Sequence, residues 1–92
     1  MFSERITVVG RVQGVGFRAH VVRAAGAYRV TGSVRNLPAA GVEIIAQHPD
    51  GHVLYEGFLR QVAEGPGKVD LLWCQGFKGE VFEAFQIAYG PP

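Results

Sequence analysis

The hydrophobic positions near the start of the chain change their spacing at a pair of glycines. From Glu4 to Val12, β-branched residues alternate with other side chains, which predicts a strand. Gly14 and Gly16 then interrupt the pattern, because glycine adopts backbone conformations that other residues avoid. From about Phe17 to Tyr28 the apolar residues recur on one helical face. We therefore expect a strand, a glycine-rich turn and a helix.

The middle of the chain predicts a hairpin and a second helix. Strand-like segments run from about Val30 to Leu37 and from Gly41 to Gln47. The short turn between them favours an antiparallel hairpin. An apolar stripe at helical spacing from about Val53 to Ala63 predicts the second helix, with Asp50 as a candidate cap.

Two further strands are expected near the end of the chain. The first runs from Lys68 to Gln75, with Val69, Leu71 and Trp73 on one face. We expect Trp73 to pack and its neighbour Cys74 to be a small core residue. A short final strand carries the alternating residues Phe85, Ile87 and Tyr89.

This order of elements predicts an α+β fold of the ferredoxin-like βαββαβ type. Right-handed crossovers would place two helices on one face of an antiparallel sheet, and a short C-terminal strand would extend it. With 92 residues and no linker, the sequence predicts a single domain over residues 1–92. The fold by itself hosts many functions, so function has to be read from particular residues.

Composition excludes several classes of protein. Hydrophobic residues are 48% and charged residues 18%, as in ordinary globular domains. A single cysteine excludes a disulfide scaffold. No apolar run reaches the roughly 20 residues of a membrane helix, and no secretory signal is visible. We expect a cytoplasmic protein that does not associate with a membrane.

The charge distribution points to a small anionic ligand. The net charge is +1, yet residues 1–36 contain six arginines against one acid. A basic region attracts anions, although arginines scattered over a solvated surface explain the same count. Aromatic residues do not interleave with the arginines, as stacking on nucleic acid would require. An RNA-binding module on this fold would also need aromatics exposed on its central strands, and the sequence does not suggest them.

The turn between the first strand and the first helix is the candidate anion site. Backbone N–H groups at a helix start have no partner inside the helix and carry the positive end of its dipole. Arg18 lies in the first helical turn, where its planar guanidinium can bind two phosphoryl oxygens. The plain alternative is a glycine turn with no ligand. A dinucleotide site would need an acidic residue about 20 positions on, and a P-loop would need Gly-Lys-Ser/Thr; both are absent.

Histidine and cysteine positions give no metal site. His20, His48 and His52 have no metal-ligand spacing with Cys74, so we expect no metal and no cofactor. His20 is expected at the surface, pointing away from Arg18.

Two motifs carry a resemblance to a known family. The segment from Gly10 to Arg18 and the segment from Gly32 to Asn36 resemble the two motifs of the acylphosphatase family, and Gly65-Pro66 and Phe85-Gln86-Ile87 match further landmarks. The resemblance implies metal-independent hydrolysis of the carboxyl-phosphate bond of small acyl phosphates, giving carboxylate and inorganic phosphate without a covalent intermediate.

The resemblance also implies site residues and partners. Asn36 would position the attacking water, and Arg18 would bind the phosphate with loop amides. These substrate-binding positions are Gln13, Gly14, Val15, Gly16, Phe17 and Arg18. The partners implied are an acyl phosphate substrate and inorganic phosphate, and we expect a monomer with no nucleic-acid partner.

The sequence departs from the family at three places. Ser33 stands where an aromatic is usual, Arg29 stands where a glycine commonly follows the helix, and Ala39-Ala40-Gly41 replaces the usual Asp-Gly turn. A changed turn could move Asn36, so two alternatives stay open. One is a non-catalytic phosphate- or anion-binding module. The other is an acylphosphatase-like domain of a carbamoyl phosphate-using protein, as in hydrogenase-maturation carbamoyltransferases.

Overall fold

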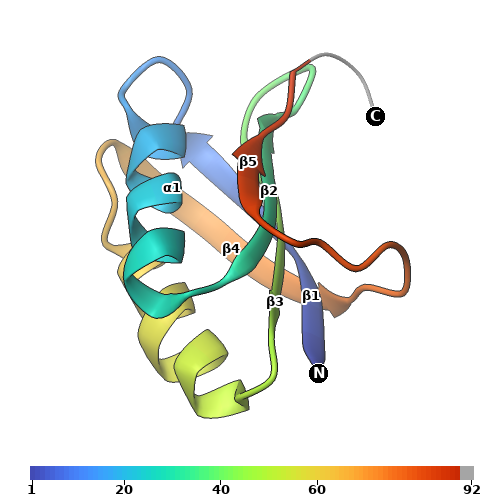
Figure 1. The fold of residues 1–92 in the computed structure, drawn as a ribbon. Helices are drawn as coiled ribbons and strands as arrows, with labels where there is room; N and C mark the ends of the chain where they lie inside the picture. The colour runs from blue at the N-terminus through green and yellow to red at the C-terminus, as the bar shows by residue number, and fades with distance from the viewer. Residues whose placement is uncertain (90–92) are drawn as a thin grey trace.

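A computed structural model describes residues 1–89 as a five-stranded sheet with helices on one face (Figure 1). Every predicted strand and helix is present, with ends shifted by at most a few residues. The elements are β1 (Phe2–Arg11), α1 (Phe17–Tyr28), β2 (Thr31–Asn36), β3 (Val42–His48), η1 (Val53–Leu59), α2 (Arg60–Ala63), β4 (Lys68–Gly76) and β5 (Phe85–Ile87).

The sheet has the strand order β4-β1-β3-β2-β5, which confirms the ferredoxin-like fold. β1 pairs antiparallel with β3 and β4, β2 pairs antiparallel with β3 as the predicted hairpin, and β5 runs parallel to β2. Val42 at the start of β3 is the register partner of both Val8 in β1 and Asn36 in β2. These three residues therefore form one row across the three central strands, where β2 ends and β3 begins.

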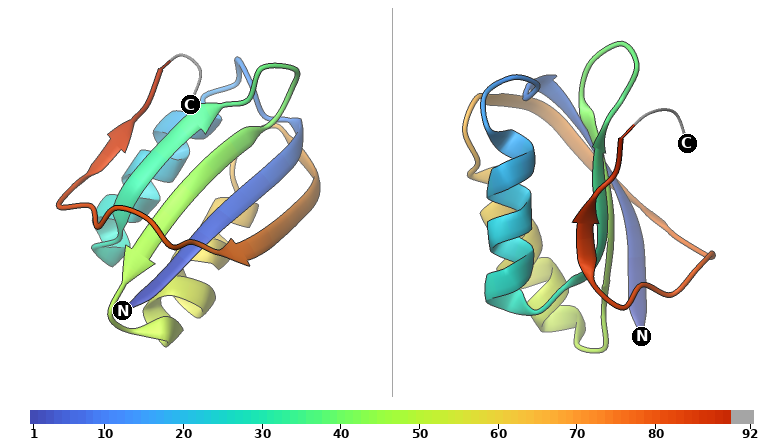
Figure 2. Two further views of the ribbon diagram at one scale, coloured as in Figure 1. Left: turned by 90° about the vertical axis from the view of Figure 1, so that its right-hand side faces the viewer. Right: turned by 45° about the horizontal axis from the view of Figure 1, so that its top comes forward.

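The core lies between the sheet and its helical layer (Figure 2). The predicted helical stripes supply it, since Phe17 and Val21 of α1 and Phe58 of η1 are at most 1% exposed. From the sheet, Ile6, Val8, Val34, Val42 and Ile44 are equally buried. Burying a side chain of this size stabilises the fold by about 1.5–3 kcal/mol.

The second helix begins as predicted but is wound differently. The Asp50 carboxylate accepts hydrogen bonds from the backbone N–H groups of His52 and Val53, at 2.9 and 3.4 Å, and so caps the helix. η1 is π-helical, and the chain then tightens into the short helix α2. Gly57 in η1 allows close packing on α1, because a Cβ there would lie 2.5 Å from Cε1 of Tyr28.

The predicted burial of Trp73 and Cys74 in β4 is wrong, and Val69, Leu71 and Trp73 do not share one packed face. Leu71 is 57% exposed, Trp73 is 39% exposed, and Cys74 is an exposed free cysteine. The register with β1 shifts at Asp70, where an extra residue forms a bulge and breaks the alternation of faces. Val69 and Leu72 pack on the core instead. β4 is also an edge strand, so one of its sides has no neighbouring strand.

The segment between β4 and β5 crosses the face of the sheet opposite the helices (Figure 2). Gln47, only 2% exposed, holds it there. Its Nε2 donates to Glu80 O at 2.8 Å and to Ser3 Oγ at 3.1 Å, and its Oε1 accepts from the backbone N–H of Phe82 at 2.9 Å. The crossing delivers β5 to the far edge of the sheet, beside β2.

The final strand is shorter than predicted. β5 ends at Ile87, and Tyr89 lies beyond it with 78% of its surface exposed. The backbone N–H of Ala88 still donates to Val34 O at 2.8 Å, which fixes the direction in which the chain leaves the sheet. Within residues 1–89, no helix has the length and apolar character needed to cross a membrane.

Arg29 ends α1 in a left-handed conformation, with φ 57° and ψ 39°. A side chain is strained there by about 1 kcal/mol, whereas glycine is not. We expect Arg29→Gly to raise the free energy of unfolding by about 0.5–1 kcal/mol, measured by urea denaturation. The exposed mid-helix residue Arg23 is the control, because Arg23→Gly should lower it by about 1 kcal/mol. Equal destabilisation by both variants would contradict the strain.

The Tyr55 hydroxyl of η1 donates a hydrogen bond to the Glu4 carboxylate of β1. This bond, helped by burial and by the charge of Glu4, raises the pKa of Tyr55 from its ordinary value of 10.0 to about 12. The folded state thus favours the neutral hydroxyl, and the stabilisation is complete below pH 10 and lost as the pH rises through 12. We expect the stability advantage of the wild type over Tyr55→Phe, measured by urea denaturation, to shrink over this range. A difference in stability between the two proteins that stays constant from pH 10 to 12 would refute the raised pKa of Tyr55.

Candidate active site

The predicted anion loop is present between β1 and α1. Gly14 and Gly16 have φ values of 75° and 84°, a region that suits glycine. Gly16 is the N-cap of α1, no side chain caps this end, and no acidic residue lies in the first turn. The first amides of the helix and the positive end of its dipole are therefore left for an external anion.

At the start of α1, Phe17 points into the core and the next residue, Arg18, lines the candidate site. The Phe17 ring is 1% exposed and anchors the loop in the core. Arg18 follows it and is partly exposed. A cavity of about 200 Å³ opens beside them, lined by Val12, Gly14, Gly16, Phe17, Arg18, Ala19 and Ile87. Of the predicted binding residues, the structure brings Gly14, Gly16, Phe17 and Arg18 together in this lining; Gln13 and Val15 flank it.

Asn36 ends β2 next to this loop without lining the cavity itself. The alternation along β2 puts it on the same face as Val34, which is the helical face. Within residues 1–89, Oδ1 of Asn36 is buried and has no hydrogen-bond partner. A buried acceptor of this kind costs about 1–3 kcal/mol unless it is satisfied by a ligand or water.

The side chain of Gln13 connects the loop to the end of β2. Its Nε2 donates to Leu37 O at 2.9 Å and to Gly41 O at 2.8 Å. Leu37 directly follows Asn36, and its own N–H donates to Gly41 O at 3.0 Å. The turn at 39–41, where the sequence differs from the family pattern, is therefore closed by a hydrogen bond and joined to the loop by the Gln13 side chain.

Sequence reasoning missed two residues from the end of the chain. Ile87 of β5 forms one wall of the cavity. The ring of Tyr89 lies over Arg18, with 5.4 Å between Cζ and the ring centroid, as in a cation–π contact. The sequence signals were the alternation Phe85-Ile87-Tyr89 and the family landmark Phe85-Gln86-Ile87, and neither assigned these residues to the site. Nothing in it showed that the last strand runs parallel to β2 and so ends beside the loop.

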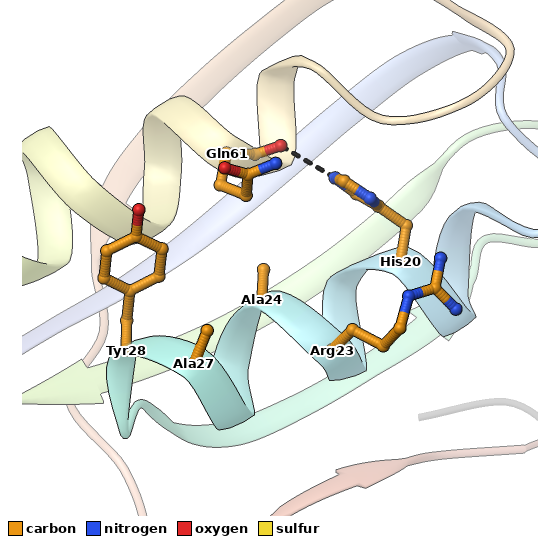
Figure 3. A pocket seen from close by; sticks show the side chains of 6 residues that line it. All are labelled: His20, Arg23, Ala24, Ala27, Tyr28 and Gln61. Atoms are coloured by element: carbon orange, nitrogen blue, oxygen red, sulfur yellow. Dashed lines mark hydrogen bonds between the residues drawn. The ribbon is translucent and has the colours of Figure 1, made fainter.

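A second cavity, of about 280 Å³, lies on the outer side of the helices (Figure 3). His20 and Tyr28 of α1 point toward α2, which carries Gln61, and Arg23 lines the cavity as well. His20 Nε2 donates to Gln61 O at 2.7 Å, so the protonated ring nitrogen joins the two helices. The His20 ring is half-buried between the helices, so it is only partly at the surface, where the sequence places it.

Two arginines of the sheet, Arg5 and Arg35, lie beside one carboxylate, that of Glu43. Arg35 Nε contacts Oε1 of Glu43 at 3.0 Å, and Arg5 lies 3.7 Å from the same carboxylate. The charge of Arg35 is thus neutralised on the sheet face opposite the helices. In the part of the chain that the structure describes, no three His, Cys, Asp or Glu side chains gather as metal ligands would.

Comparison with known proteins identifies the family. The acylphosphatase family matches residues 4–72. A curated acylphosphatase from Chlorobaculum tepidum is 46% identical over 63 residues, which cover 68% of this chain and 66% of that protein. One from Caldivirga maquilingensis is 38% identical over 89 residues, covering 92% of both chains.

Solved structures agree with the sequence match. The crystal structure of an acylphosphatase from Bacillus subtilis superposes with a TM-score of 0.89 at 36% identity, covering 97% of this chain and 100% of that one. Full-length HypF in its phosphate- and nucleotide-bound form gives a TM-score of 0.82 at 26% identity, covering 96% of this chain but 12% of HypF. The chain belongs to the acylphosphatase family, whose members are hydrolases acting on acyl phosphates. The predicted family, fold class and enzyme class are confirmed.

Proposed function

We propose that the site at the start of α1 catalyses metal-independent hydrolysis of the carboxyl-phosphate bond of small acyl phosphates. The observation that carries the proposal is the uncapped, acid-free helix start with Arg18 beside it. The backbone amides of residues 13–18 and the Arg18 guanidinium bind the phosphoryl oxygens. Each charge-assisted hydrogen bond of this kind contributes about 1.5–3 kcal/mol.

Asn36 positions the attacking water in this proposal. Its buried Oδ1 needs a donor, and a water molecule at the end of β2 would supply one. Phosphoryl transfer has a loose transition state and depends mostly on positioning and charge stabilisation. The carboxylate leaves readily, and a phosphoryl oxygen takes the proton of the water. These steps use no covalent intermediate.

The proposed site is assembled within one chain, which supports a monomer as the functional unit and residues 1–92 as one domain. On the face opposite the helices, the central strands β1 and β3 carry Arg5, Thr7 and Glu43, rather than the aromatic platforms that RNA-binding sheets use. A second candidate function is that of an acylphosphatase-like domain working with carbamoyl phosphate. The similarity to HypF, of which the matched part is 12%, shows that a domain of this fold also occurs within a larger protein.

Inorganic phosphate should bind in the loop and stabilise the folded protein. We expect the melting temperature of the wild type to rise with phosphate concentration, because a ligand that binds only the folded state shifts the equilibrium towards it. Arg18→Ala should weaken phosphate affinity by on the order of 10–100-fold, the loss of one or more charge-assisted bonds. Arg23→Ala, an exposed arginine on the same helix, is the matched control. Equal loss in both variants would reject a specific role for Arg18.

Hydrolysis of benzoyl phosphate in the presence of EDTA tests the catalytic part. The wild type should turn over, and Asn36→Ala should reduce kcat by on the order of 100-fold or more, because the water loses its positioning group. Phosphate binding without turnover by the folded wild type would favour the non-catalytic module. Turnover of carbamoyl phosphate alone would favour the second candidate, and loss of activity in EDTA would refute a metal-independent reaction.

A further inference from the structure

We infer that the side chain of Gln13 is a positioning residue that sets where Asn36 stands relative to the phosphate-binding loop. The inference rests on the proposed function and goes beyond it, because there Gln13 contributes only its backbone amide. The side-chain amide makes contacts of its own, to the carbonyls of Leu37 and Gly41.

The sheet topology explains why such a connection is needed. The loop follows β1 and Asn36 ends β2, yet β3 separates these strands in the order β4-β1-β3-β2-β5. No ladder of hydrogen bonds therefore joins the two strands directly. Val8 and Asn36 are related only through Val42, and the chain leaves the sheet four residues after Val8, at Val12. The loop is thus beyond the reach of the β-sheet pairing that fixes Asn36.

The Nε2 group of Gln13 joins the loop to the end of β2 and to the residue before the start of β3. It donates at 2.9 Å to Leu37 O, one residue after Asn36, and at 2.8 Å to Gly41 O, one residue before β3 begins. An amide nitrogen has two N–H donors, so both bonds can form together and both carbonyls of the turn are engaged. Gly41 O also accepts from the Leu37 N–H, so the same group closes the turn and ties it to the loop.

The turn between β2 and β3 is also held against β1, on the side away from Gln13. Gly41 is buried with φ 90°, and a Cβ there would lie 2.5 Å from Val8 O. Gly41 thus sits against the backbone of β1, and Gln13 supplies the tie on the side of the loop. Phosphate held by the loop and water held by Asn36 then share one rigid frame. Because a misplacement of about 1 Å can cost on the order of 100-fold in rate, this tie affects catalysis more than binding.

The inference predicts a separation of kinetic parameters. Gln13→Met keeps the length of the side chain and removes both donors, and Gln13→Glu places a carboxylate opposite two carbonyl oxygens. We expect each to lower kcat for benzoyl phosphate by on the order of tenfold or more, with KM and the inhibition constant of inorganic phosphate changed less than threefold. Gln75→Glu makes the same change at an exposed position on β4 and should leave all three values unchanged.

The outcomes separate this inference from the proposed function. If the wild type does not hydrolyse acyl phosphates, the proposed function fails and this inference with it. If the wild type is active and both Gln13 variants keep its kcat, the inference alone is overturned. If kcat and phosphate affinity fall together, Gln13 merely supports the loop, which also overturns it. Circular dichroism melts verify that the variants are folded when assayed.

Discussion

The burial of one ring, Phe17, fixes the position of everything that the proposed site uses. This ring enters the core between the glycine that starts α1 and the arginine that faces the cavity. Removing such a ring from a core typically costs about 3–5 kcal/mol, so the loop cannot shift outward without losing a large part of the stability of a small domain. Gly65 keeps the space for it, because a Cβ there would come within 3.0 Å of the Phe17 ring.

Sequence reasoning predicted most of the fold because the signals were local. The glycines of the first turn, the stripe of α1 and the position of Arg18 lie within a few residues of each other, and the structure brings them together as expected. Asn36 was placed correctly at a strand end for the same reason.

The errors have two causes, an irregularity inside one strand and contacts between residues that are far apart in the sequence. A single bulge at Asp70 reversed the alternation that had suggested a buried Trp73. Ile87 and Tyr89 were absent from the predicted site because their position depends on the parallel pairing of β5, which no local pattern reports. The side-chain role of Gln13 was equally hidden, since its partners lie 24 and 28 positions away.

Because Ile87 forms one wall of the cavity, the parts of the cavity are synthesised far apart in time. A ribosome makes the loop with Arg18 early, while β5 follows only after the rest of the sheet. During synthesis the anion loop is therefore exposed on one side until Ile87 has been added and the crossing segment has laid β5 beside β2. Contacts between such distant parts of a chain slow the folding of small domains. The binding cavity is therefore complete only in a chain whose β5 has paired with β2.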